Sequence, residues 1–143
     1  MKDKDEVVMI TKKRNSLFLF PEDFQFKELS PVYPELYDYF MRICDQYPDE
    51  AGEEYMIMLI RQNLTDLTNN RKPMGHNREA RYRMIFPYGS DRVKFFVYPR
   101  ISEEESEIED ITKKISVFLK EKGFDHEILW DQMEFLKEEE KKK

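Results

Sequence analysis

The side chains with the most evident binding chemistry are concentrated in one basic stretch. Residues 71–100 contain eight basic and two acidic residues, although the whole chain has a net charge of −6. Aromatic residues alternate with the basic ones in the second half of this stretch. Cations neutralise phosphates and exposed rings stack on bases, so the combination is typical of surfaces that bind single-stranded nucleic acid. The candidate binding residues are Arg71, Lys72, Arg78, Arg81, Arg83, Arg92, Lys94, Phe96 and Tyr98.

Two apolar runs flank a Gly89-Ser90 pair, which suits a type II′ turn. They predict a β-hairpin over residues 80–98 in which Met84 lies opposite Phe95. Alternation along each strand predicts one face that packs on the core and one that is exposed. The core-facing set is Tyr82, Met84, Phe86, Val93, Phe95 and Val97, and the exposed set is Arg81, Arg83, Arg92, Lys94, Phe96 and Tyr98. Residues 68–79, which lack periodicity, predict a loop that extends the basic footprint.

Structural explanations of the basic face remain open as well. Outward cations on edge strands prevent sheets from associating edge to edge. The acidic helix that starts near Glu103 would alternatively dock on this face and pair with the cations, or Phe96 and Tyr98 would contact a second layer of helices. We favour a structural or protein-contact use of this face, and binding of nucleic acid or another polyanion is the alternative.

Candidate catalytic residues are few. His76 and His126 are the only histidines, and neither has another ligand at metal-binding spacing. The motifs of nucleotide-binding proteins, hydrolases and zinc proteases are absent. A nuclease-like metal centre at Asp49, Glu53 and Glu54 would need a converging lysine, and these acids also fit a first helical turn. We therefore predict no enzymatic activity, no cofactor and no metal.

The elements that must position these residues are predicted in the order ββ(β)-α-α-β-β-α-α. Residues 7–10 and 16–20 predict the first β-hairpin, and Phe24 and Phe26 alternate with polar residues as in a third, short strand. Runs of strands followed by runs of helices indicate an α+β fold, a small antiparallel sheet from two β-hairpins with about four helices packed on one side.

Helix boundaries follow from capping signals. Ser30 as N-cap and Pro31 in the first turn predict a helix that Pro48 ends, and a second helix is predicted over residues 49–67. The second helix contains Tyr55, Met56 and Met58, which together with Met41 and Phe40 resemble either an adaptable Met-rich binding face or ordinary core. We favour core for this group, because its spacing is helical.

The C-terminal part predicts two further helices. Ser102 and Glu105 form a capping box, and Gly123 is the expected stop of the helix that they open. Asp125 is the expected N-cap of a last helix, with Phe124 packing on Leu129 as a hydrophobic staple.

Length and composition predict one α+β domain over residues 1–137 and a solvated charged tail over residues 138–143. The longest apolar run, residues 55–60, is far shorter than the roughly 20 residues that span a bilayer. Cys44 is the only cysteine, and its place in an apolar helix predicts a buried, inert thiol in a reducing compartment. We therefore expect a cytoplasmic protein that neither enters a membrane nor carries a signal peptide.

The favoured functional hypothesis is a small acidic adaptor or regulator, similar in profile to inhibitors and accessory subunits, that acts by protein–protein contacts without catalysis. A pI near 5.1 and the few catalytic residues favour it. The alternative is a single-stranded nucleic-acid-binding module that uses the hairpin at residues 80–98 and the loop at residues 68–79. A metal-dependent, nuclease-like enzyme is the third hypothesis.

Overall fold

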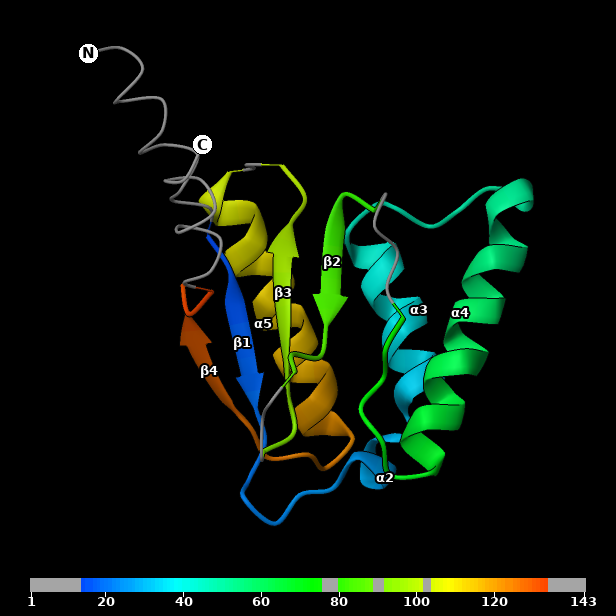
Figure 1. Ribbon diagram of the computed structural model, residues 1–143. Coiled ribbons are helices and arrows are strands. Elements are labelled where there is room, and N and C mark those ends of the chain that lie inside the picture. Colours follow the sequence, from blue (N-terminus) through cyan, green and yellow to red (C-terminus); the bar gives the residue numbers. More distant parts are fainter. Residues whose placement is uncertain (1–13, 76–79, 89–91, 102–103, 134–143) are drawn as a thin grey trace, which may run out of the picture.

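The computed structural model describes residues 14–75, 80–88, 92–101 and 104–133 of the chain. These residues form a four-stranded antiparallel sheet and four helices, so the predicted α+β class is confirmed (Figure 1). The strands lie in the order β2-β3-β1-β4. In chain order the elements are β1 (Ser16–Leu19), α2 (Phe26–Leu29), α3 (Tyr33–Ile43), α4 (Glu50–Thr68), β2 (Tyr82–Ile85), β3 (Lys94–Pro99), α5 (Glu105–Glu121) and β4 (Glu127–Trp130).

Helices cover one face of the sheet. α5 packs behind β1 and β3, α3 packs beside α5, and α4 lies on the far side of α3 (Figure 1). Phe18 on β1 and Phe95 on β3 lie opposite each other in this core, and their rings stack with centroids 4.8 Å apart. Within the described part of the chain, no helix is both long enough and apolar enough to cross a membrane.

The segment that follows β1 is helical, so the predicted third strand is wrong. Phe26–Leu29 forms the short helix α2, and the backbone N–H of Gln25 donates to Glu28 Oε2 at 2.7 Å. Phe24 stacks on Phe20 with centroids 4.6 Å apart. Alternation over only three residues fits a strand or a helical turn equally well, and here the capping contact selects the turn.

The two long N-terminal helices are present, but both boundaries of the first one are moved, and this helix ends at Ile43 and not at Pro48. Ser30 ends α2 and does not cap the next helix; α3 begins at Tyr33 with Pro34 in its first turn. α4 begins as predicted, because Asp49 Oδ1 accepts a hydrogen bond from the backbone N–H of Gly52 at 3.0 Å. The short connection through Pro48 makes α3 and α4 an antiparallel pair (Figure 1).

The second hairpin has the predicted faces in a different register. Met84 lies opposite Val97 and Arg83 opposite Tyr98, a slip of two residues from the predicted pairing of Met84 with Phe95. A slip of two preserves the alternation, which is why periodicity does not reveal it. The predicted core set is confirmed as buried, namely Tyr82, Met84, Phe86, Val93, Phe95 and Val97. Residues 89–91, which include the predicted turn, lie outside the described residues.

α5 ends at a glycine, as predicted. The N–H of Phe124 donates to Leu119 O at 2.9 Å and the N–H of Gly123 donates to Lys120 O at 3.0 Å, which is the Schellman arrangement. Gly123 adopts a φ of +87°, in the left-handed region that glycine tolerates best. Ser102, the predicted cap at the other end of this helix, lies outside the described residues.

The last predicted helix is wrong, because Glu127–Trp130 is the strand β4. β4 pairs with the outer edge of β1, with Ile128 opposite Phe18 and Leu129 opposite Leu17. Its side chains alternate in exposure, which indicates a strand half covered by other residues. The apolar residues of this segment also fit a helical stripe, and the unpaired edge of β1 decides between the two. β1 thus has a strand on each side; residues 7–10 of the first predicted hairpin and the tail at 138–143 lie outside the described residues.

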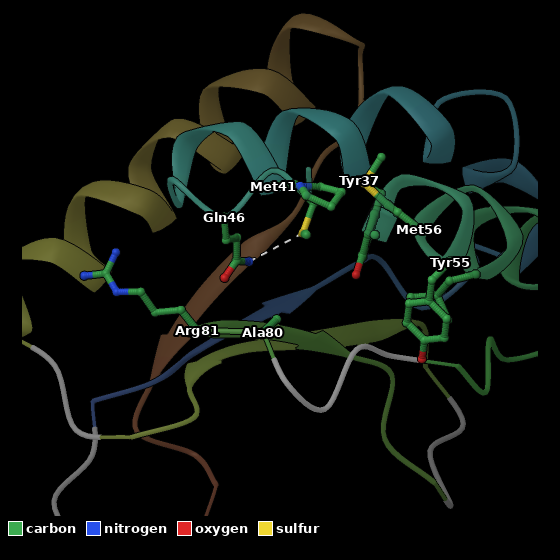
Figure 2. A pocket seen from close by; sticks show the side chains of 10 residues that line it. Tyr37, Met41, Gln46, Tyr55, Met56, Ala80 and Arg81 are labelled. Carbon is green, nitrogen blue, oxygen red and sulfur yellow. Dashed lines mark hydrogen bonds between the residues drawn. The ribbon is translucent and has the colours of Figure 1, made fainter. Parts of the chain in front are cut away.

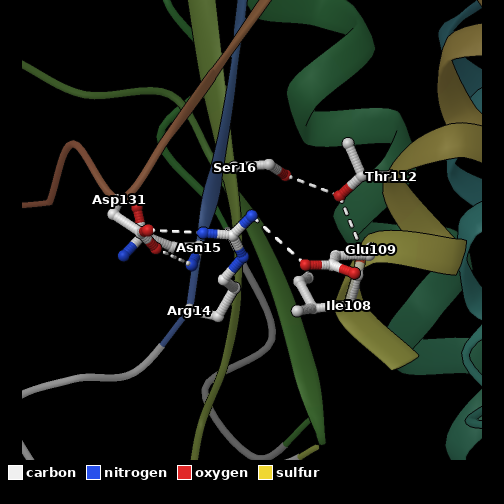
Figure 3. A network of polar contacts seen from close by, with 7 residues as sticks. All are labelled: Arg14, Asn15, Ser16, Ile108, Glu109, Thr112 and Asp131. Atoms are coloured by element: carbon white, nitrogen blue, oxygen red, sulfur yellow. Dashed lines mark hydrogen bonds and ion pairs between the residues drawn. The ribbon is translucent and has the colours of Figure 1, made fainter. Parts of the chain in front are cut away.

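A polar clasp holds β4 to the start of β1 (Figure 3). The Arg14 guanidinium contacts Asp131 Oδ2 at 2.6 Å and Glu109 Oε2 on α5 at 3.2 Å, and it lies over the ring of Trp130. Asp131 and Asn15 exchange two further hydrogen bonds through their backbones and the carboxylate. The clasp therefore joins the residues before β1 to α5 and to the end of β4.

Two hydroxyl contacts connect α5 to β1 and to the loop that follows α5 in the chain. The hydroxyl oxygens of Thr112 and Ser16, both buried, lie 2.9 Å apart (Figure 3). The Ser116 hydroxyl donates to His126 Nε2 at 2.7 Å, and His126 Nδ1 donates to Phe124 O. Burial lowers the pKa of His126 below its ordinary value, so the neutral ring fits this pair of bonds.

Candidate functional site

The basic residues of the predicted site are dispersed over the surface and most have partners. Arg71 pairs with Asp66 at 3.2 Å, and Lys72 lies over the exposed ring of Tyr88. Burial lowers the pKa of the Lys72 ammonium group. Arg78 and His76 lie outside the described residues.

Arg81 faces an acidic residue of its own chain. Its guanidinium donates to the carboxylate of Glu107 on α5 and to the backbone carbonyl of Cys44. The same carboxylate accepts the Tyr82 hydroxyl at 2.6 Å, and the hydrogen bonds from Arg81 and Tyr82 hold the pKa of Glu107 below its ordinary value. α5 therefore supplies an ion-pair partner to Arg81, but it packs on the core face of the sheet, so the explanation in which this helix docks on the basic face is wrong.

The other cations of the hairpin are half-exposed, where the sequence predicts exposure. Arg92 donates to Phe20 O through Nε and Nη2, at 3.2 and 2.6 Å. The Arg83 guanidinium lies 5.9 Å from the ring centroid of Tyr98, and Lys94 lies opposite Leu19 on β1. The Arg92 guanidinium therefore joins the segment before β3 to the end of β1, and Arg83 contacts a ring of the same hairpin.

The two aromatic residues of the predicted plate are buried. Phe96 and Tyr98 do lie on the sheet face that points away from the helices, but each is only 7% exposed. They form a second, small apolar cluster with Leu17 and Met133, against which Ile85 packs. The predicted exposure of the rings is therefore wrong, and neither ring presents a free face for base stacking. Met133 follows β4, so the error goes back to the mistaken last helix.

A pocket lies between α3, the first half of α4 and the residues that lead into β2 (Figure 2). Its volume is about 240 Å³, and its walls are mainly apolar. Met41, Met56 and Leu59 contribute aliphatic and thioether surface, and Tyr37 and Tyr55 reach it from different helices. The pocket is thus built by the antiparallel packing of α3 and α4.

Gln46 closes the pocket beside the edge of the sheet. Its Nε2 donates to Tyr82 O at 2.9 Å, and its Oε1 accepts the N–H of Tyr82 at 2.8 Å. The amide thereby replaces a neighbouring strand at this point of β2. Its nitrogen also lies 3.5 Å from Met41 Sδ (Figure 2). The polar atoms of Gln46 are therefore satisfied within the protein.

Tyr37 is different, because its hydroxyl points into the pocket. The side chain is only 3% exposed, and its ring lies 5.9 Å from that of Tyr33 and 6.0 Å from that of Phe40. Its Oη makes no hydrogen bond with any residue that the structure describes. Burial, together with the neighbouring Tyr55 and Cys44, raises the pKa of the phenol to about 12. At neutral pH the group is therefore protonated and is able to donate a hydrogen bond.

The surface of α4 beside the pocket is unusually apolar. Residues 55–60 are all apolar and span more than one helical turn, so apolar side chains project on every side of the helix. Met56 and Leu59 face the core, but Tyr55 is 47% exposed, Ile57 40% and Met58 50%. A helix that is apolar all round is normally buried.

Exposed carboxylates lie at the N-terminal end of this apolar surface. They are the exposed residues Asp45, Asp49, Glu50, Glu53 and Glu54. Among the described residues none of the five forms a salt bridge. The basic side chain beside them, Arg42, pairs with Asp38 at 2.9 Å. The positive end of α4 accounts for the acids in its first turn but not for the exposed apolar side chains that follow them.

The prediction that Met41, Met56, Met58 and Tyr55 belong to the core is only partly right. Met41 and Met56 are buried, but Tyr55 and Met58 are not. The six consecutive apolar residues could have predicted this exposed apolar surface, since an ordinary surface helix carries a polar face.

The chain matches no protein-family model, no curated protein and no solved structure. Across residues 14–75, 80–88, 92–101 and 104–133, no three His, Cys, Asp or Glu side chains are grouped so that they could hold a metal ion. The absence of enzymatic activity and of a cofactor stays a prediction.

Proposed function

We propose that this protein is a non-enzymatic adaptor or regulator that binds a protein partner through the first half of α4. The observation that carries the proposal is the exposure of Tyr55, Ile57 and Met58 on a helix segment whose core side is also apolar. Burying these three side chains in an interface removes apolar surface from water, which is the main driving force of protein association.

The partner surface is basic around an apolar centre. The exposed carboxylates at the start of α4 and before it would lie at the rim of such an interface, where charge steers association and selects partners. Because these carboxylates form no salt bridge with the residues that the structure describes, a cationic partner does not have to displace such a bridge.

The nucleic-acid alternative has no comparable support. Phe96 and Tyr98 are buried, and Arg81 and Arg92 already donate to groups of the same chain. Single-strand binding needs accessible rings beside free cations, and among the described residues of the hairpin only Tyr88 presents an exposed ring.

The proposal is tested by affinity capture from native cell extract with three baits, the wild type and the variants Met58→Glu and Val117→Glu. Val117 on α5 is the matched control, since it is 54% exposed and also helical. We expect a stoichiometric partner that survives nuclease treatment, is lost with Met58→Glu and is retained with Val117→Glu. Equal capture by both variants, or material that nuclease removes, would contradict the proposal.

A further inference from the structure

We infer that the pocket between α3 and α4 receives one side chain of the partner, a ring with a polar edge such as that of tyrosine, held in a basic segment. This inference rests on the proposed function and specifies what the interface recognises. Three observations carry it: the size of the pocket, the unpartnered hydroxyl inside it and the acidic surroundings.

The size of the pocket favours a single side chain. About 240 Å³ is below the roughly 300–1,000 Å³ of sites for cofactors and drug-sized ligands. It accommodates one aromatic ring with its substituent. The exposed ring of Tyr55 stands at the pocket and belongs to the same apolar surface as Met58, so a partner that covers α4 has its own side chains beside the opening.

The walls favour an aromatic ring over an aliphatic chain. Met41 and Met56 offer polarizable sulfur atoms, which make favourable contacts with ring edges. Tyr37 and Tyr55 add two rings, and aromatic pairs stabilise one another beyond their buried area.

The hydroxyl of Tyr37 selects a ring that carries a polar atom. A ring that fills the pocket shuts this hydroxyl off from solvent, which is costly unless a ligand oxygen accepts its proton. Because its pKa is raised to about 12, the hydroxyl keeps that proton throughout the physiological range. A phenylalanine in the pocket would leave the group unsatisfied and exclude water from it, whereas a tyrosine oxygen would accept the bond.

The exposed carboxylates near the pocket favour basic residues on either side of the inserted ring. Asp45, Glu50 and Glu53 are exposed at this corner of the molecule, where α3 ends and α4 begins. Lysine or arginine residues on either side of the inserted ring would lie near these carboxylates, and acidic flanking residues would be repelled.

The inference is tested with three capped pentapeptides: tyrosine between two pairs of lysines, phenylalanine between the same lysines, and tyrosine between two pairs of glutamates. Binding is measured by NMR titration of the full chain at low salt. We expect the lysine-flanked tyrosine peptide to bind roughly three- to tenfold more tightly than its phenylalanine counterpart, the effect of one hydrogen bond. The glutamate-flanked peptide should bind most weakly.

Two variants locate the effect. Tyr37→Phe removes only the unpartnered oxygen and should abolish the preference for tyrosine while leaving the fold intact. Tyr39→Phe is the matched control, because Tyr39 lies on the same helix but stacks on Phe118 instead of lining the pocket. It should leave the preference unchanged.

The outcomes separate the inference from the proposed function. Lysine-flanked peptides that bind better than the glutamate-flanked one without distinguishing tyrosine from phenylalanine would overturn the inference and leave the proposed function standing. A preference for tyrosine that persists in Tyr37→Phe would also overturn it. If none of the peptides perturbs α3 or α4 and Met58→Glu leaves partner capture unchanged, both fail.

Discussion

Asn63 on α4 holds the backbone of Gly75 by two hydrogen bonds. Its Nδ2 donates to Gly75 O at 2.9 Å, and its Oδ1 accepts the N–H of Gly75 at 3.0 Å. The same nitrogen donates to the Tyr33 hydroxyl at 2.8 Å, so one buried amide connects α3, α4 and the segment after α4. A Cβ at Gly75 would lie 2.6 Å from Leu59 Cδ1, so a larger residue at this position requires the Leu59 side chain to move.

Asn63→Ala should lower the free energy of unfolding by about 2–4 kcal/mol, because it leaves several buried polar groups without partners. Gln62→Ala is the matched control on the same helix, and its exposed side chain should cost less than about 0.5 kcal/mol. Chemical denaturation of both variants gives the comparison. Equal stability of the two variants would show that the amide bridge contributes nothing.

Phe95→Ala should destabilise the protein by about 3–5 kcal/mol, as large-to-small substitutions in a core do. Phe95 is fully buried and stacks on Phe18, so its removal leaves a cavity between β1 and β3. Val117→Ala, on the exposed side of α5, should change stability by less than about 0.5 kcal/mol. Thermal unfolding measures both effects.

Cys44 should react slowly with a thiol reagent in the native protein and rapidly after denaturation. The side chain is 1% exposed, and burial raises the pKa of its thiol, so the reactive thiolate is scarce. Timed labelling followed by mass spectrometry measures the two rates. Fast, stoichiometric labelling without denaturant would contradict this placement.

Stability should fall as the pH falls below the ordinary histidine pKa of about 6.5. Burial lowers the pKa of His126 in the folded state, so the unfolded chain takes up the proton first and is favoured in that range. Above that range the contribution is fully present. In His126→Gln the part of the pH dependence that comes from this residue should disappear, and denaturation curves between pH 7 and pH 5 measure it. An unchanged pH profile in the variant would assign the dependence to other groups.

Single-stranded RNA or DNA should not bind measurably even at about 50 mM salt, where phosphate contacts are strong. The reason is that Phe96 and Tyr98 are buried and Arg81 and Arg92 are engaged within the chain. Fluorescence anisotropy with a labelled oligonucleotide tests this. Binding that weakens linearly with the logarithm of salt concentration, and that Arg83→Gln and Lys94→Gln reduce, would restore the nucleic-acid hypothesis.

The sequence by itself determined the helix ends that depend on contacts between residues close together in the chain. Asp49 caps α4 and Gly123 ends α5, because each contact lies within a few residues of its partner. The alternation around Met84 and Phe95 assigned the faces of the hairpin correctly, since exposure repeats every second residue whatever the neighbouring strand does.

Only the tertiary structure decided the features that depend on distant partners. Residues 127–130 form a strand because β1, more than a hundred positions earlier in the chain, offers them an unpaired edge. That pairing brings Met133 onto Phe96 and Tyr98 and buries the rings that the sequence predicted to be exposed. The pocket likewise exists only because α3 and α4 pack together. The sequence places Tyr37 on a helix, but only the packing shows that its hydroxyl points into the pocket. Periodicity describes which face a side chain occupies, but what covers that face is set by the packing of the whole chain.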